Sequence, residues 1–334
     1  MGKKVKWGVL GVASIATRKV IPGMQKGALC ELSAIASRDR QKAQAAAKEL
    51  GIPKAYGAYQ ELLADPEIDA IYIPLPNHLH VPWSAKAAEA GKHVLCEKPI
   101  GRNAAEAAEL IRVRDRTGVK VGEAFMVKTH PQWLRVRELI RSGKIGTLKS
   151  IVTIFSYFNR DPQNVRHNPE WGGGGLLDIG SYPITLSRWL FGEEPRRVAG
   201  AIELDPDFGT DRLASGLLEF SSGHSAFVSG TQTNYFQRME ILGTTGRLAV
   251  EIPFNAPNDK PTHLTVADGM AIYDGTVKVE EIPTCDQYSL QGDAFSRAIL
   301  ENTEVPVPLE DALGNMKVID AIFRSTKSGC WEAP

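Results

Sequence analysis

The chain has 334 residues with 39 Lys and Arg against 39 Asp and Glu, so its formal net charge is zero. This balance argues against a nucleic-acid partner, because such proteins carry an excess of cations, and no apolar run reaches the roughly 18 residues of a membrane span. The length predicts about two domains, and the composition is typical of a globular protein.

Residues 1–122 alternate short apolar runs with helix-like segments. The expected strands are Val5–Leu10, Leu32–Ala36, Ala70–Pro74, Lys92–Cys96 and Lys120–Gly122. The expected helices are Ala13–Lys26 with a break at Pro22, Arg40–Leu50, Tyr59–Ala64, Val81–Ala90 and Ala104–Thr117. Strands that alternate with helices of this length indicate a parallel, doubly wound sheet.

The pattern changes after residue 122. Helices are expected at His130–Ser142, Asp178–Phe191, Leu290–Glu301 and Leu309–Ser328. Strands are expected at Leu148–Phe158, Arg197–Leu204, Leu213–Phe220, Ser225–Thr233, Arg238–Leu242, Leu248–Glu251, Thr262–Val266 and Val277–Ile282. We therefore predict an α/β chain with a dinucleotide-type domain at 1–122. An α+β domain with a mostly antiparallel sheet follows at 123–334, and its C-terminal helix packs back on the first domain.

A degenerate dinucleotide fingerprint lies where the first strand should turn into a helix. Gly11 would make the tight turn, Ala13 would sit beside the pyrophosphate, and Ala16 would allow close helix packing. Ser14 and Ile15 complete the loop, whose helix N-terminus is suited to an anion. The motif alone is weak evidence, because a βα turn in another doubly wound protein would look similar.

The end of the second strand indicates which cofactor is bound. An NAD-binding protein calls for Asp or Glu there, to bind the ribose 2′-hydroxyl. This chain has Ser37 and Arg38, and a guanidinium suits a 2′-phosphate, so NADP is expected in preference to NAD. The neighbouring Asp39 complicates this interpretation, and a solvated turn is the structural alternative for Arg38.

Three further segments carry polar residues that point to a ligand site. In such sheets ligands bind beyond the carboxyl ends of the strands, where Asn77, His80 and Lys98 are expected. The first ends in Pro76, Asn77 and His80, and the second in Glu97, Lys98 and Pro99. The third is the glycine run 172–175, which precedes Asp178 and Tyr182.

Together these segments resemble the glucose–fructose oxidoreductase/inositol dehydrogenase (Gfo/Idh/MocA) family over essentially the whole chain. The marks are the loop at 11–16, the tripeptide at 97–99 and the pattern Asp178-x-Gly180-x-Tyr182. Segments 123–126, 130–132 and 164–166, with tyrosine rather than histidine at 182, look like the branch of NADP-dependent aldose and dihydrodiol dehydrogenases. The resemblance implies a Rossmann domain followed by a domain whose open-faced sheet forms a homodimer or homotetramer.

The resemblance also implies the site residues. The cofactor contacts would be Gly11, Ala13, Ser14, Ile15, Ala16, Ser37, Arg38, Pro76, Asn77, His80, Glu97, Lys98, Pro99, Arg166 and Trp171. Arg166 is equally consistent with a surface arginine, and Trp171 either stacks near the nicotinamide or packs on the glycine run.

Lys98, Tyr182 and Asp178 make chemical sense as catalytic residues. Tyrosine, with a pKa of about 10, is a poor base at neutral pH, but an ammonium beside it favours phenolate. Lys98 would supply that charge and a hydrogen bond to the reacting oxygen. Asp178 would orient Lys98 or bind a substrate hydroxyl, and its structural alternative is a helix N-cap. We expect the Lys98–Pro99 peptide bond to be cis.

The function expected from these residues is that of an NADP-dependent sugar or polyol oxidoreductase. Oxidation of an aldose to its lactone is the reaction we expect before any other. A reductase of deoxysugar or dihydrodiol substrates and a non-catalytic NADP sensor are the alternatives. The sensor is disfavoured because it has no need for Lys98, Asp178 and Tyr182. We expect no metal, and the widely spaced cysteines indicate a reducing, cytoplasmic location.

Overall fold

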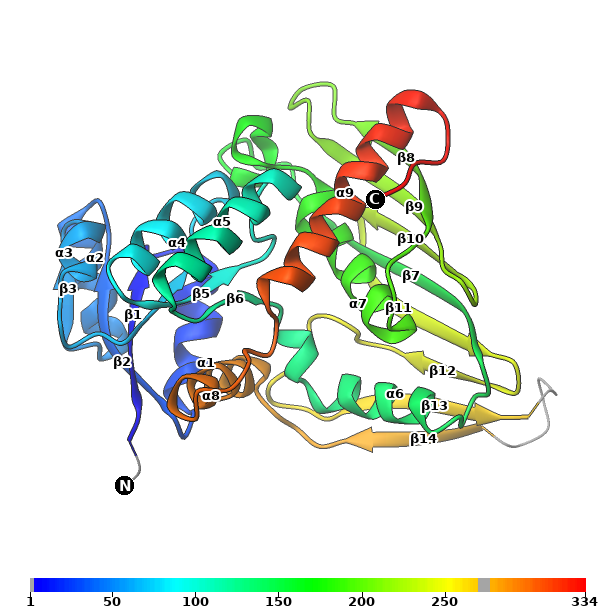
Figure 1. Cartoon of the computed structure of the whole chain (residues 1–334), viewed down its shortest axis with the longest axis horizontal. Helices are drawn as coiled ribbons and strands as arrows, with labels where there is room; N and C mark the ends of the chain where they lie inside the picture. Colours follow the sequence, from blue (N-terminus) through cyan, green and yellow to red (C-terminus); the bar gives the residue numbers. More distant parts are fainter. Residues whose placement is uncertain (1–2, 270–276) are drawn as a thin grey trace. The chain divides into compact units, whose positions relative to one another are not determined.

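A computed structural model describes residues 3–269 and 277–334 (Figure 1). The described residues divide into two compact units. The first unit runs through His130 and adds Asp286–Leu313, and the second holds Pro131–Cys285 and Gly314–Pro334. Within these residues, no helix is long and apolar enough to cross a membrane.

The first unit is built on a parallel sheet. Its described strands are β1 (Val5–Leu10), β2 (Cys30–Ala36), β3 (Lys54–Tyr56), β4 (Ala70–Ile73), β5 (His93–Glu97) and β6 (Val121–Ala124). They are arranged in the order β3-β2-β1-β4-β5-β6, with every pair parallel. The order reverses between β1 and β4, and the carboxyl ends of strands at such a switch point are where ligands bind.

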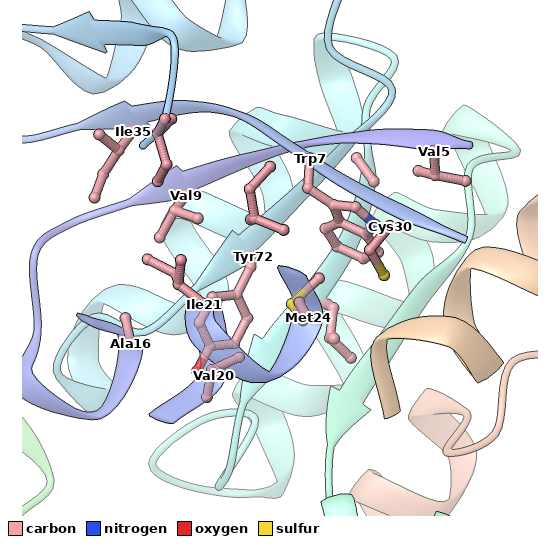
Figure 2. Close-up of a cluster of buried hydrophobic side chains, with 14 of the residues drawn as sticks. Val5, Trp7, Val9, Ala16, Val20, Ile21, Met24, Cys30, Ile35 and Tyr72 are labelled. Atoms are coloured by element: carbon pink, nitrogen blue, oxygen red, sulfur yellow. The ribbon is translucent and has the colours of Figure 1, made fainter. Parts of the chain in front are cut away.

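Helices flank this sheet. They are the π-helix η1 (Ala16–Val20), α1 (Ile21–Gln25), α2 (Arg40–Leu50), α3 (Tyr59–Leu63), the 3₁₀-helix η2 (Asn77–Leu79), α4 (His80–Glu89), α5 (Ala104–Thr117), the 3₁₀-helix η3 (Met126–Thr129) and α8 (Gln287–Leu300). Figure 2 shows the core on one face, where Trp7 is fully buried. Its ring lies 5.6 Å from Phe295 of α8, and its indole N–H donates to Ser296. A helix distant in sequence thus completes this core.

The second unit contains a larger sheet. Its described strands are β7 (Leu148–Phe158), β8 (Arg197–Leu204), β9 (Asp211–Glu219), β10 (His224–Gly230), β11 (Gln232–Gly243), β12 (Gly246–Val250), β13 (Thr262–Asp268) and β14 (Val277–Ile282). Their order is β14-β13-β12-β11-β7-β10-β9-β8, and only the β7–β10 pair is parallel. The expected fold class, a doubly wound parallel sheet followed by a mostly antiparallel one, is confirmed.

The second unit also contains helices, and several of them pack on its sheet. The helices are α6 (Pro131–Arg141), the 3₁₀-helices η4 (Val165–His167) and η5 (Pro169–Trp171), the π-helix η6 (Leu176–Gly180), α7 (Ser181–Phe191) and α9 (Leu309–Ser328), whose first residues belong to the first unit. Those that pack on the sheet include α6, α7, η6 and α9. Strand β7 shows the asymmetry, because Ile151 and Phe155 are buried while Val152 and Ile154 between them are exposed. Side chains alternate across a strand, so on β7 the second face of the sheet carries apolar side chains that the described residues leave exposed.

Candidate active site

The loop after β1 has the features that a dinucleotide needs. Gly11 has φ +107°, a conformation that favours glycine, and its amide donates to Ala36 O at 2.8 Å. A Cβ at Gly11 would also lie 3.0 Å from Leu75. Ala13 is partly exposed, Ser14 and Ile15 are exposed, and Ala16 is fully buried in η1. The loop backbone is thus accessible to a ligand, while Ala16 packs the helix against the sheet.

The residues after β2 are those expected to distinguish NADP from NAD. Ser37 is buried and Arg38 is exposed. The Asp39 carboxylate accepts the amides of Gln41 and Lys42, so it caps α2. Asp39 thus has a structural role as the cap of α2, and Ser37 and Arg38 remain the residues predicted to contact the 2′-phosphate.

Tyr59 adds to this end of the sheet and was missed by the sequence analysis. It is buried, and its hydroxyl would lie 3.7 Å from a Cβ at Gly11. Burial raises the pKa of Tyr59, whereas its hydrogen bond with Arg38 opposes that shift. Tyr59 therefore links the glycine turn to the arginine expected to bind the 2′-phosphate.

Three hydrogen bonds hold the segment that carries Lys98. The Tyr72 hydroxyl donates to Glu97 Oε1 at 2.6 Å, and the Ile100 amide donates to Glu123 Oε1 at 2.7 Å. The third involves His80, whose Nδ1 lies 2.7 Å from Pro99 O. The Lys98–Pro99 bond is cis, as expected. Lys98 itself is partly buried. Because Glu97, Pro99 and Ile100 are all hydrogen-bonded, the backbone is fixed on both sides of Lys98.

His80, which we predicted as a cofactor contact, is buried between two loops of the first unit. It is 1% exposed, and its second ring nitrogen, Nε2, lies 2.6 Å from Leu75 O. Burial lowers the pKa of His80 to about 4, so the ring is neutral at pH 7. With both nitrogens directed at backbone carbonyls, His80 joins the loop after β4 to the loop after β5. Pro76 and Asn77, at the start of η2, remain partly exposed.

Asp178 is the centre of a polar cluster in the second unit. Its Oδ2 accepts a hydrogen bond from the Tyr157 hydroxyl at 2.7 Å and another from Arg166 Nε at 2.6 Å. Burial and the Asp178 charge raise the pKa of Tyr157, which therefore stays protonated as a donor. Asp178 lies inside η6, whose N-cap is Gly175 with no side-chain cap, so the N-cap alternative for Asp178 is wrong.

Tyr182 follows in α7 and is held by aromatic packing. It is 6% exposed, and its ring lies 5.7 Å from Phe155 and 5.2 Å from Phe254. The Arg166 guanidinium, whose pKa is raised mainly by Asp178, also interacts electrostatically with Tyr182. The structure thus brings Arg166, Asp178 and Tyr182 together and adds Tyr157, which the sequence pattern of β7 did not single out.

Two further observations complete the site. Trp171, in η5, is 40% exposed, and its amide donates to Asn168. Among the residues that the structure describes, no group of three or more His, Cys, Asp and Glu side chains is arranged to hold a metal ion.

Comparison with protein families gives two matches along the chain. Residues 5–125 match the model of an oxidoreductase family with an NAD-binding Rossmann fold. Residues 133–249 match the model of the GFO/IDH/MocA C-terminal domain.

Individual relatives extend over nearly the whole chain. A D-xylose 1-dehydrogenase (NADP⁺) from Haloferax volcanii is 40% identical over 97% of this chain and 98% of its own. A dTDP-3,4-didehydro-2,6-dideoxy-α-D-glucose 3-reductase from Saccharopolyspora spinosa is 34% identical over 98% and 99%. Among solved structures, a 3-ketoreductase from Actinomadura kijaniata in complex with NADP and TDP-benzene superimposes with a TM-score of 0.89. It is 29% identical and covers 97% of this chain and 98% of its own.

Proposed function

The chain belongs to the GFO/IDH/MocA family of NAD-binding oxidoreductases, and from this premise we propose that it oxidises a sugar or polyol with NADP⁺, most readily an aldose to its lactone. The observation that carries the proposal is the placement of Tyr182 beside the Arg166–Asp178 pair in a packed aromatic setting. A cation near a tyrosine favours its phenolate, which is the form that can accept a hydroxyl proton. The relative that is a D-xylose dehydrogenase supports the aldose substrate.

The residues of the first unit suit NADP. The positive φ of Gly11 and the loop at 12–15, which is partly exposed at Val12 and Ala13 and exposed at Ser14 and Ile15, allow a pyrophosphate to approach the backbone. Ser37 and Arg38 offer a hydroxyl and a guanidinium to a 2′-phosphate, while Asp39 is used as a helix cap. When bound, NADP supplies or accepts the hydride. We assign the cofactor to residues 1–122, and the substrate and subunit contacts to 123–334.

Replacing Arg38 by alanine tests the cofactor assignment. We expect the KM for NADP⁺ to rise about 10-fold or more, in line with about 1.5–3 kcal/mol for a hydrogen bond to a charged group. The KM for NAD⁺ should change little, because NAD has no 2′-phosphate. Initial rates with both cofactors measure this, and Arg40→Ala on the same helix start is the matched control. An equal effect on both cofactors would remove Arg38 from the phosphate site.

Each proposed catalytic residue has a distinct role. Tyr182 accepts the proton of the reacting hydroxyl, and in the reverse direction returns it to the carbonyl oxygen. Lys98 donates a hydrogen bond to that oxygen of the bound substrate. Asp178 binds a neighbouring substrate hydroxyl, and Tyr157 and Arg166 fix its carboxylate.

A second candidate is the reduction of a keto-deoxysugar. It is supported by the 34% identity with a deoxysugar 3-reductase over nearly the whole chain. The same proton transfer by Tyr182 serves both directions, so the proposed catalytic residues do not distinguish them. Substrate preference does, since a deoxysugar nucleotide would then be turned over faster than any free aldose.

The exposed apolar side chains of the second sheet support a homo-oligomer. Ile154 of β7 pairs with Val228 of β10, and both side chains are about 40% exposed. Val152 of β7 and Leu217 of β9 extend this apolar area, and contiguous exposed apolar patches commonly mark interfaces. We expect light scattering to give at least twice the chain mass of 36.4 kDa, with Ile154→Lys shifting the mass toward the monomer. A wild-type monomer would contradict this part of the proposal.

A further inference from the structure

Asp211 is a buried carboxylate that the proposed mechanism does not use. It opens β9 and is only 4% exposed. Its Oδ2 accepts the backbone N–H of Leu176 at 2.5 Å. Leu176 is the first residue of η6, which leads directly into α7, so this helical stretch carries both Asp178 and Tyr182. The first N–H groups of a helix have no partner within the helix, and Asp211 supplies one.

The glycine run before this helix is shaped around Asp211. Gly174 has φ +111°, and a Cβ there would collide with Asp211 Oδ1. The Gly174 amide donates to Arg166 O at 2.9 Å, while the Arg166 side chain binds Asp178. The run is therefore held by Asp211 on one side and by the Arg166 backbone on the other. Close approach of these groups, rather than flexibility, explains the glycines.

The charges around Asp211 come from several elements. The Asp178 carboxylate of η6 raises the pKa of Asp211 by repulsion, and Tyr157 of β7 interacts electrostatically with Asp211. Arg166 of η4 forms an ion pair with Asp178. Burial is the largest influence and raises the pKa of Asp211 to about 7, although the amides of Leu176, Gly175 and Asp211 itself oppose the shift. The three amides all donate hydrogen bonds to the carboxylate. A protonated Asp211 would direct its own O–H at these N–H groups and would bind them less well.

We propose that Asp211 is a positioning residue whose carboxylate fixes the start of the η6–α7 helix, and so holds Asp178 and Tyr182 in place for the reaction. This inference rests on the proposed function for its kinetic consequence, but its structural consequence is independent of it. Ionised Asp211 holds the Gly175 and Leu176 amides, and protonation weakens that hold. Catalysis should therefore be lost on the acid side of neutral pH.

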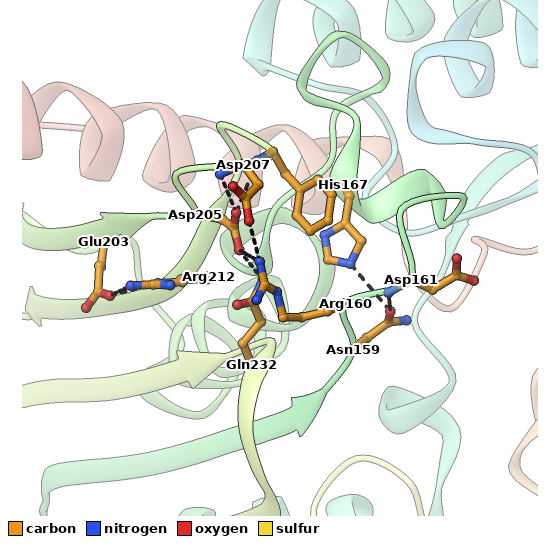
Figure 3. Close-up of polar contacts among 10 residues, drawn as sticks. Asn159, Arg160, Asp161, His167, Glu203, Asp205, Asp207, Arg212 and Gln232 are labelled. Atoms are coloured by element: carbon orange, nitrogen blue, oxygen red, sulfur yellow. Dashed lines mark hydrogen bonds and ion pairs between the residues drawn. The ribbon is translucent and has the colours of Figure 1, made fainter.

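The kinetic test replaces Asp211 by asparagine, which keeps the shape and removes the charge. We expect kcat at pH 8 to fall about 10- to 100-fold, the scale of a small misplacement of catalytic groups. The deficit should shrink toward pH 6, because the wild type loses its own carboxylate there. Asp205→Asn is the matched control. Asp205 is equally buried and also accepts backbone amides, those of Asp207 and Phe208 (Figure 3), but it does not contact the glycine run.

Stability provides a second readout. Because the pKa of Asp211 is higher in the folded chain than in the unfolded chain, its ionisation costs folding stability as pH rises from about 4 to about 7. The melting temperature of Asp211→Asn minus that of wild type should therefore be more positive at pH 8 than at pH 5. If Asp211 merely stabilised the fold, the melting temperature of Asp211→Asn at pH 8 would instead fall, and kcat would fall in proportion to it.

Hydrogen exchange tests the positioning without any substrate. At one pH, the Gly175 and Leu176 amides should exchange faster in Asp211→Asn than in wild type. In Asp205→Asn their exchange rates should equal those of wild type. If exchange there is unaltered, or if both variants lower kcat equally at every pH, Asp211 has no positioning role. If exchange rises but the wild type turns over no substrate with NADP, the proposed function fails and the positioning role stands.

Discussion

Replacing Lys98 by alanine should lower kcat by at least about 100-fold, the smaller limit of what a positioned proton-transfer group contributes. Lys98 follows β5 on a segment held by Tyr72, His80 and Glu123. Because that segment is fixed by its backbone and by Glu97, loss of the ammonium should not disturb it. The loss of activity should therefore arise from the missing hydrogen bond to the reacting oxygen of the substrate.

The measurement is the initial rate at saturating NADP⁺ and substrate, with melting temperature as a check on folding. Lys48→Ala, at an exposed position near the end of α2, is the matched control and should keep full activity. If the Lys98→Ala enzyme turned over within about threefold of wild type, Lys98 would have no part in catalysis.

Replacing Tyr182 by phenylalanine should be as damaging, with kcat again lower by about 100-fold or more. The change removes only the hydroxyl, and the ring keeps its contacts with Phe155 and Phe254, so melting temperature should change little. Tyr235→Phe, an exposed tyrosine, is the control.

The double variant separates cooperation from independence. Because Lys98 and Tyr182 are proposed to act on one oxygen, removing both should cost much less than the product of the two single losses. Losses that simply multiply would mean that the two residues act in separate steps.

Much of the fold follows from local pattern. The bounds of β7 and α9 agree with the predicted segments at Leu148–Phe158 and Leu309–Ser328, because each is a long, strongly patterned run. The edge strand β3 was missed, since its three residues are too few to establish a period. The predicted Asp178–Phe191 helix begins earlier, at Leu176, where Asp211 supplies a partner for the first amide.

The candidate site was only partly visible in the sequence. Motifs at strand ends located Gly11 and Lys98, and the pattern after the glycine run located Asp178 and Tyr182. The partners of Asp178 were not predictable, because Tyr157 and Asp211 approach it from strands 21 and 33 residues away in the chain. His80 shows the opposite limit, since its place after a strand was predictable but the inward direction of its ring depends on two distant carbonyls.

The central claim is that this chain oxidises a sugar with NADP⁺, and the most direct test is a substrate panel followed at the nicotinamide absorbance. Aldoses, polyols, dihydrodiols and a keto-deoxysugar nucleotide are assayed with NADP(H) and NAD(H) in parallel. We predict turnover of at least one aldose, with a higher kcat/KM for NADP⁺ than for NAD⁺. Binding of NADP⁺ without oxidation or reduction of any panel member would contradict the claim and favour a non-catalytic sensor.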